Sequence, residues 1–337
     1  MIELNGVIVA VTDERPRILV VQHSDHPGNP TGQESDSPLD ALPFGPLDPA
    51  ADRTLELGLR RWVQERTGIE LGYVEQLYTF GDRNRDPREL EGGHRVISVP
   101  YLALVKEKQL SAMGTARWHN WYEFFPWEDW LLRRSSVIGE EIAPALDRWV
   151  RSDPNPESRA RRRERAEIAF GLGGTTWDEE RVLDRYELLY ETGLVAEQGR
   201  DRELGIEYKK ESSGSSRQLP TQSCGASMGR PMALDHRRIL ATAMGRLRGK
   251  IKYRPVVFEL LPRSFTLLQL QRVVETLAGV HVHKQNFRRF VERGGLVEDT
   301  GQSEAKTGGR PAKLFCFRRE VLRERPAPGV GLPGAGR

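Results

Sequence analysis

Short apolar runs separated by polar turns dominate the first 105 residues of the chain. Residues 6–11 and 17–21 are rich in β-branched side chains, and residues 74–80 and 95–105 have the same character. Such runs, bounded by turn-forming residues, predict strands. Residues 23–43 are instead rich in Pro, Gly, Ser and Asp, which predicts a long loop.

One helical stripe interrupts these strands. Leu55, Leu59 and Val63 are four residues apart and therefore fall on one face of a helix. Asp52 or Thr54 can cap its first turn, because both side chains accept hydrogen bonds from backbone amides. Strands on either side of a helix predict an α+β domain.

The middle of the chain alternates helical and polar stretches. Residues 142–150 predict a second helix, whereas the charged residues 151–165 predict a solvated linker. Thr176 and Glu179 have the spacing of a capping box, which predicts the start of another helix. Residues 198–231 are polar and serine-rich, and they predict a mobile loop.

Residues 121–130 carry six aromatic side chains. Such a cluster can stack on nucleotide bases, but it packs more often in a core or a dimer interface. We predict packing.

A regular helical pattern returns in the last third of the chain. Residues 235–253 have apolar side chains four apart, and Thr266 can cap a further helix that ends before Gly279. A helix over 283–293 follows after a short turn, and apolar residues at 296–297 and 313–317 predict two strands. This order of elements predicts a winged helix-turn-helix.

These elements divide the chain into three parts and a tail. We predict an α+β domain over 1–152, a helix-containing insertion and mobile linker over 153–234, a winged helix-turn-helix domain over 235–325 and a flexible tail over 326–337. The formal net charge is only +3. However, the third part holds 20 Lys and Arg against 9 Asp and Glu, whereas the remainder holds 31 against 39. A basic segment in an otherwise acidic chain favours contact of that segment with nucleic acid.

Composition removes several other classes of protein. No run approaches the roughly 18 consecutive apolar residues of a membrane span. Only two cysteines occur, Cys224 and Cys316, which excludes a disulfide scaffold and fits a reducing cytoplasm. The seven histidines show no metal-ligand spacing. We therefore expect a cytoplasmic protein without a metal site or a required cofactor.

The predicted DNA-binding surface is the second helix of the helix-turn-helix together with the hairpin that follows it. In a helix-turn-helix, the second helix lies in the major groove of DNA, and its first residues contact the base edges. Arginine and lysine suit guanine, glutamine and asparagine suit adenine, and cations on the wing neutralise phosphates. The alternative is a winged helix that serves only protein contacts. The predicted DNA-binding residues are Thr266, His283, Lys284, Gln285, Asn286, Arg288, Arg289, Lys306, Arg310 and Lys313.

The first domain resembles the Nudix fold, whose sequence box reads Gly-x5-Glu-x7-Arg-Glu-U-x-Glu-Glu-x-Gly-U, where U is a bulky aliphatic residue. Trp62 and Arg66 stand where two carboxylates of the box belong, and Arg53 stands at the upstream acid. Because Mg²⁺ needs carboxylate oxygens, we expect no catalytic residues and no metal. The resemblance implies a catalytically inactive Nudix-like α/β/α sandwich. The matching positions are Arg61, Val63, Glu65, Gly68 and Ile69.

A degenerate Nudix-like domain before a winged helix resembles the Nudix-related transcriptional regulators of NAD metabolism. The resemblance covers most of the chain outside 198–231 and the tail. Residues 42–47 and 186–195 are similar to the alphaproteobacterial branch, which represses NAD-synthesis genes. The other similar stretches are 72–86, 95–104, 235–253, 284–289 and 308–314.

The resemblance implies a homodimeric repressor that binds a palindromic operator and responds to a nucleotide effector, such as ADP-ribose, NAD or a relative. In the family, the stretch that corresponds to 78–86 lies near the effector pocket. An aromatic ring there is expected to stack on adenine, and arginines are expected to meet phosphates. The alternative is an ordinary polar loop after a strand. The predicted effector-binding residues are Tyr78, Phe80, Asp82, Arg83, Arg85, Arg88 and Glu65.

Two other functions compete with the repressor. One is a Nudix hydrolase that acts on ADP-ribose or another nucleoside diphosphate derivative and carries an accessory DNA-binding module. The other is a protein-interaction scaffold, which predicts no DNA affinity above non-specific levels. Magnesium-dependent release of AMP would favour the hydrolase.

Overall fold

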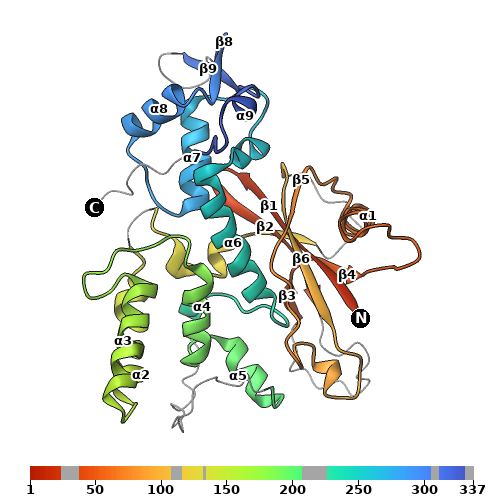
Figure 1. The fold of residues 1–337 in the computed structure, drawn as a ribbon, viewed down its shortest axis with the longest axis vertical. Coiled ribbons are helices and arrows are strands. Elements are labelled where there is room, and N and C mark those ends of the chain that lie inside the picture. Colours follow the sequence, from red (N-terminus) through yellow and green to blue (C-terminus); the bar gives the residue numbers. More distant parts are fainter. Residues whose placement is uncertain (24–37, 108–115, 132–133, 207–225, 305–310, 331–337) are drawn as a thin grey trace.

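The computed structural model describes residues 1–23, 38–107, 116–131, 134–206, 226–304 and 311–330. Figure 1 shows a sheet on one side, a group of helices on the other, and a small helical unit with a hairpin above them. The predicted α+β class is confirmed. None of the helices in these ranges is long and apolar enough to cross a membrane.

The sheet is built around its first strand. Its strands are β1 (Ile2–Thr12), β2 (Arg15–His23), β3 (Leu39–Ala41), β4 (Phe44–Pro46), β5 (Tyr73–Gln76), β6 (Ile97–Leu104) and β7 (Arg117–Asn120). The order is β3-β2-β1-β6-β5, with β4 paired to β1 and β7 paired to β2. β1 and β6 run parallel, and the other pairs are antiparallel. The strand predicted at 74–80 is shorter, because only an isolated bridge from Phe80 to Ser98 continues it.

Alternation along β1 gives the sheet two apolar faces. Ile8 points to the face that α1 (Leu55–Thr67) covers. Thr54 caps α1 by accepting a hydrogen bond from a backbone amide of the first turn, and Gly68 ends it in the left-handed conformation. The predicted helix is confirmed, and Thr54 rather than Asp52 is its cap.

The opposite face of the sheet is covered by α6 (His236–Tyr253), which runs between the sheet and the other helices (Figure 1). Val7 of β1 belongs to the same buried cluster as Ile239 and Leu247 of α6. α2 (Ala143–Arg151), at the end of the predicted first domain, packs on α3 (Pro156–Phe170). The boundary predicted at residue 234 therefore lies within one packed unit, because α6 follows it in the chain and yet covers one face of the N-terminal sheet.

The middle segment is more helical than its charge pattern predicts. The solvated linker predicted at 151–165 was wrong, because Asn155 caps α3 and this helix buries apolar residues at its C-terminal end. α4 (Val182–Glu191) begins after the predicted capping box and has no side-chain cap. α5 (Ala196–Glu203) occupies the start of the loop predicted at 198–231, of which 207–225 lie outside the described residues.

The aromatic cluster packs inside the protein, as predicted. Trp121, Tyr122, Phe124, Phe125 and Trp127 are each at most 5% exposed. Two short 3₁₀ turns, Trp121–Glu123 and Pro126–Glu128, place these rings against α4 and α6.

The C-terminal unit has the predicted winged helix order. α7 (Leu267–Ala278) ends at Gly279, whose φ of 76° is left-handed, and a short turn leads into α8 (Lys284–Arg293). The wing consists of β8 (Val297–Glu304) and β9 (Ala312–Phe317), and α9 (Val321–Glu324) follows. Both wing strands were predicted, and β8 extends well beyond 296–297.

A buried ionic cluster joins the three parts of the chain. Glu128 accepts hydrogen bonds from Arg185 of α4 and from Arg248 of α6, each at 2.5 Å, and all three side chains have no exposed surface. Burial raises the pKa of Glu128, but the two arginines outweigh it and hold that pKa below its ordinary value. Arg248 also donates to the Leu277 carbonyl of α7 at 3.0 Å. α4 and α6 are thereby bonded to one carboxylate, and Arg248 links α7 to the same cluster.

Candidate nucleic-acid interface and effector loop

α8 presents most of its surface to solvent. Its only buried side chains are Phe287 and Val291, which lie one turn apart on one face. His283 precedes the helix without making a side-chain cap. The exposed residues at its start are His283, Lys284, Gln285, Asn286, Arg288 and Arg289.

The geometry of an α-helix indicates how far each of these exposed side chains points away from the buried face of α8. At about 100° per residue, Gln285 and Arg289 project opposite the buried face, whereas Arg288 lies closer to it. Arg288 also pairs with Glu292 at 3.2 Å, which offsets part of its charge. Arg289 and Gln285 are therefore the side chains best placed to enter a groove.

Thr266, a predicted DNA contact, caps α7. It is 6% exposed, and its hydroxyl accepts a hydrogen bond from the Gln269 amide at 3.1 Å while the Gln269 side chain accepts from the Thr266 amide. This capping box fixes the start of α7. The hydroxyl oxygen is thus engaged in the helix cap, and a DNA contact by this side chain stays a prediction.

The wing is only partly described. Lys313 is exposed and donates a hydrogen bond to Asp299 across the hairpin at 2.8 Å. This bond from Lys313 lowers the pKa of Asp299. The predicted contacts Lys306 and Arg310 lie outside the described residues.

The predicted effector residues in the loop after β5 differ in exposure, because some are at the surface and others are buried. Tyr78 is 71% exposed, and Asp82, Arg83 and Arg88 are exposed as well. Phe80 is 5% exposed and belongs to the core, so its predicted stacking on adenine was wrong. The Tyr78 and Phe80 rings make an edge-to-face contact, with their ring centroids 5.5 Å apart.

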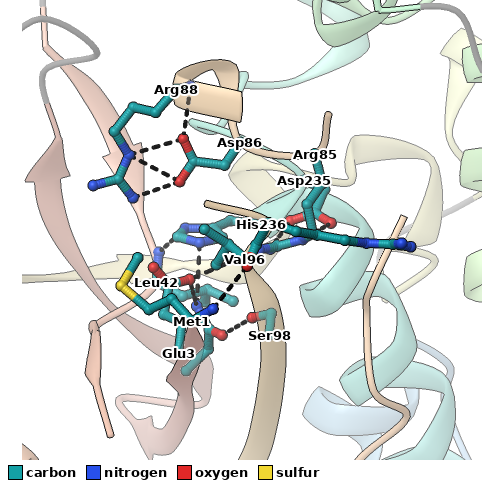
Figure 2. A network of polar contacts seen from close by, with 12 residues as sticks. Met1, Glu3, Leu42, Arg85, Asp86, Arg88, Val96, Ser98, Asp235 and His236 are labelled. Carbon is teal, nitrogen blue, oxygen red and sulfur yellow. Dashed lines mark hydrogen bonds and ion pairs between the residues drawn. The ribbon is translucent and has the colours of Figure 1, made fainter. Parts of the chain in front are cut away.

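Arg85 was also predicted to meet phosphates, and the structure corrects this. Its side chain has no exposed surface, and its guanidinium donates two hydrogen bonds to Asp235, at 3.0 and 2.5 Å (Figure 2). Asp235 lies directly before α6, 150 positions along the chain. Arg85 therefore ties the loop to the central helix.

Arg88 remains at the surface beside this network. Its guanidinium bonds Asp86, and 61% of its side chain is exposed. Burial raises the pKa of Asp86, yet the hydrogen bonds from Arg88 outweigh it and keep that pKa below its ordinary value. Figure 2 shows this pair next to Arg85 and Asp235.

His236, the first residue of α6, extends the network into the sheet (Figure 2). Its Nδ1 accepts a hydrogen bond from the Leu42 amide at 3.1 Å, and its Nε2 lies 3.2 Å from the Asn5 amide group. Burial lowers the pKa of His236 to about 3, so the ring is neutral. Burial likewise raises the pKa of Glu3, whose carboxylate lies 4.0 Å from Arg85.

Asp235 and His236 were not predicted to take part in this network. The only local signal was two polar residues at the start of a helix, which also fits a cap. Asp235 makes no capping hydrogen bond with its side chain.

The Nudix-box positions on α1 are engaged in packing and ion pairs. Arg61 makes a two-pronged contact with Asp52, at 2.9 and 3.0 Å, and lies 3.2 Å from Glu65. The Trp62 ring lies against Gly45 and leaves no room there for a Cβ atom. Glu65 is exposed, with 57% of its side chain accessible. The described residues contain no group of three or more acidic, histidine or cysteine side chains arranged to hold a metal.

Comparisons with known proteins decide the identity of the C-terminal unit. Residues 257–317 match the model of the NrtR DNA-binding winged helix domain. These residues form an NrtR-type winged helix domain. The matched segment contains α7, α8 and both wing strands.

Solved structures share the fold of the whole chain. A Shewanella oneidensis NrtR bound to a 27mer DNA aligns with a TM-score of 0.53 at 22% identity, covering 96% of this chain and 95% of that one. A MutT/nudix family protein from Enterococcus faecalis aligns with a TM-score of 0.50 at 17% identity, covering 94% and 86%. The predicted fold, a Nudix-like α/β/α sandwich followed by a C-terminal winged helix-turn-helix domain, is confirmed.

A sequence relative covers less of the chain. The ADPR responsive transcriptional repressor NtrR of Acinetobacter baylyi is 40% identical over 86 residues, or 26% of this chain. The match spans about a third of the length of that relative, 34%.

Proposed function

We propose that this protein is a homodimeric transcriptional repressor of NAD biosynthesis or salvage genes, in which two winged helices bind a palindromic operator. One observation carries the proposal: α8 buries only Phe287 and Val291 and exposes hydrogen-bonding and cationic side chains within an NrtR-type domain. A helix buried on one face and polar on the other fits a major groove. A DNA-binding repressor of this kind acts in the cytoplasm.

The proposed effector is a nucleotide with ADP-ribose as the first candidate. The Acinetobacter relative is an ADPR responsive repressor by name. Exposed Tyr78 offers a ring for the adenine, while Arg83 and Arg88 offer cations for the phosphates. Arg85 and Phe80 are excluded from direct contact because both are buried.

The proposed signal runs from residues 78–88, the effector loop, through Arg85 to α6. Arg88 bonds Asp86, and the residue before Asp86, Arg85, bonds Asp235 at the start of α6. A ligand that moves Arg88 or Asp86 would therefore also displace Arg85 and, through it, Asp235. α6 has 18 residues and is therefore about 27 Å long. Near its far end, Arg248 bonds the last turn of α7, and the Ile251 carbonyl accepts from Val330 at 2.7 Å. A shift at the start of α6 would thus reposition the helix-turn-helix.

We also propose that the sandwich does not hydrolyse nucleotides. Trp62 supports this proposal, because it stands at a carboxylate position of the Nudix box and its ring packs against Gly45. Arg61 supports it as well, because its guanidinium pairs with the carboxylates of Asp52 and Glu65. Magnesium would find few free carboxylate oxygens there.

A gel-shift experiment tests the proposal. Duplexes from NAD-synthesis promoters and from the protein's own upstream region are compared with shuffled duplexes of equal length at about 150 mM salt, a physiological ionic strength. We expect a preference for promoter DNA of at least the ~10³-fold typical of specific binding. ADP-ribose, NAD, nicotinamide mononucleotide and ATP are then titrated separately, and ADP-ribose is expected to change the affinity. Equal binding of promoter and shuffled DNA would contradict a repressor function.

A further inference from the structure

A hollow of about 430 Å³ lies beside the C-terminal half of α8. Arg289 and Arg293 of α8 contribute to it, and Arg325, which directly follows α9, lines it from another part of the chain. The Arg325 guanidinium lies 3.5 Å from the Arg293 carbonyl at the end of α8. The remaining lining residues are Asn286, Phe290 and Gly294.

The charge of this hollow distinguishes it from two others on the described surface. Its described lining contains three arginines and no carboxylate. The hollow between α3 and α4 has three arginines and three carboxylates, and the groove below the wing has five cations and three carboxylates. Within the described part of the chain, no ion pair of 4 Å or less joins Arg289, Arg293 or Arg325 to an acid.

Three like charges that line one hollow repel one another, and because its described lining holds no carboxylate, a bound anion relieves this repulsion. Guanidinium groups bind phosphate through paired hydrogen bonds, which a flat array of arginines can supply together. The hollow continues the exposed face of α8 that begins with Gln285 and Asn286. A DNA backbone next to this helix would therefore run over it.

We propose that this arginine hollow binds a DNA phosphate, so that Arg325 is part of the DNA-binding surface although it lies beyond the NrtR-type domain at 257–317. The inference rests on the proposed repressor function and extends it. It adds a contact that carries no sequence information and fixes the position of α8 on the duplex. Phe290, which is 39% exposed, forms an apolar wall of the hollow.

The test compares Arg325→Gln with Arg323→Gln in the full chain. Arg323 lies on α9, is exposed and does not line the hollow, so its variant removes the same charge from the same region. Affinity for an operator duplex and for a shuffled duplex is measured between 50 and 200 mM salt. One lost phosphate contact lowers the salt slope by about 0.9, which reduces the affinity ratio between these two salt concentrations roughly 3.5-fold.

We expect this reduction for Arg325→Gln on both duplexes, because a phosphate contact acts equally on every sequence. Arg323→Gln should keep nearly the wild-type slope. Equal slopes for Arg325→Gln and the wild type would overturn the proposal while leaving the repressor function intact. A wild-type protein without operator preference would instead defeat the repressor function itself.

A free anion is the competing occupant of the hollow. Tripolyphosphate is therefore added at constant ionic strength, and the melting temperature of the wild type and of Arg325→Gln is measured. An increase in the wild type that is lost in the variant, together with an unchanged DNA salt slope, would assign the hollow to free anions and overturn the DNA contact.

Discussion

Replacement of Asp235 by asparagine tests whether the effector loop is tied to α6 through a buried ion pair. The Arg85 side chain has no exposed surface and the Asp235 side chain is 4% exposed. Asp235→Asn leaves a buried guanidinium without its two-pronged carboxylate, and loss of one partner of a buried pair costs about 3–5 kcal/mol. We expect the lower limit, because Glu3 lies 4.0 Å from Arg85 and remains a second acceptor.

A loss of about 3 kcal/mol lowers the ratio of folded to unfolded protein by roughly 100-fold. Urea unfolding followed by tryptophan fluorescence measures it, and with a slope of about 3 kcal/mol per molar the midpoint should fall by about 1 M. The control is Arg85→Met with Asp235→Leu, an apolar pair that should recover most of the stability. We expect this double variant to bind operator normally but to lose the response to ADP-ribose.

Two results would refute this reasoning. A change of under about 0.5 kcal/mol for Asp235→Asn, the size of an ordinary surface substitution, would show that Arg85 is not buried against this carboxylate. A double variant that is stable and still responds fully to ADP-ribose would show that the signal does not pass through the pair.

Three further predictions concern the DNA surface, the sandwich and the buried histidine. Arg289→Ala should weaken operator binding by about 1–3 kcal/mol in gel shifts, and Arg288→Ala should weaken it less, because Arg288 already pairs with Glu292; the reverse order would contradict the assigned orientation of α8. Chromatography should detect no AMP from ADP-ribose and Mg²⁺, and magnesium-dependent release that Glu65→Gln abolishes would establish a hydrolase. Between about pH 6.5 and 3, the unfolded chain binds a proton at His236 that the folded protein excludes, so stability falls as pH decreases. Between pH 7.5 and 5.5, the wild type should lose about 1.4 kcal/mol more unfolding free energy than His236→Gln, and parallel urea curves for the two proteins would contradict a buried neutral ring.

Much of the fold was predictable because local signals determine it. Four of the seven described strands, the caps at Thr54 and Thr266 and the stops at Gly68 and Gly279 all depend on near neighbours in the chain. β3, β4 and β7 were not predicted, and β3 lies within the loop predicted at 23–43. α8 was predictable for the same reason, since Phe287 and Val291 lie one turn apart and are its only buried residues. α3 was not, because a cap and a few buried residues at its C-terminal end outweigh a charge run that is typical of solvated linkers.

The sequence alone determined that a basic winged helix follows an α+β sandwich, because hydrophobic spacing, capping residues and charge are properties of short segments. The tertiary structure decided which charged residues are available for binding. Arg83, Arg85 and Arg88 look equivalent in the sequence, yet only Arg85 is buried, because α6 brings Asp235 to it from 150 positions away. Likewise, Arg325 joins Arg289 and Arg293 only because the residue after α9 lies against the end of α8. Such pairings depend on contacts between distant segments, which no local pattern encodes.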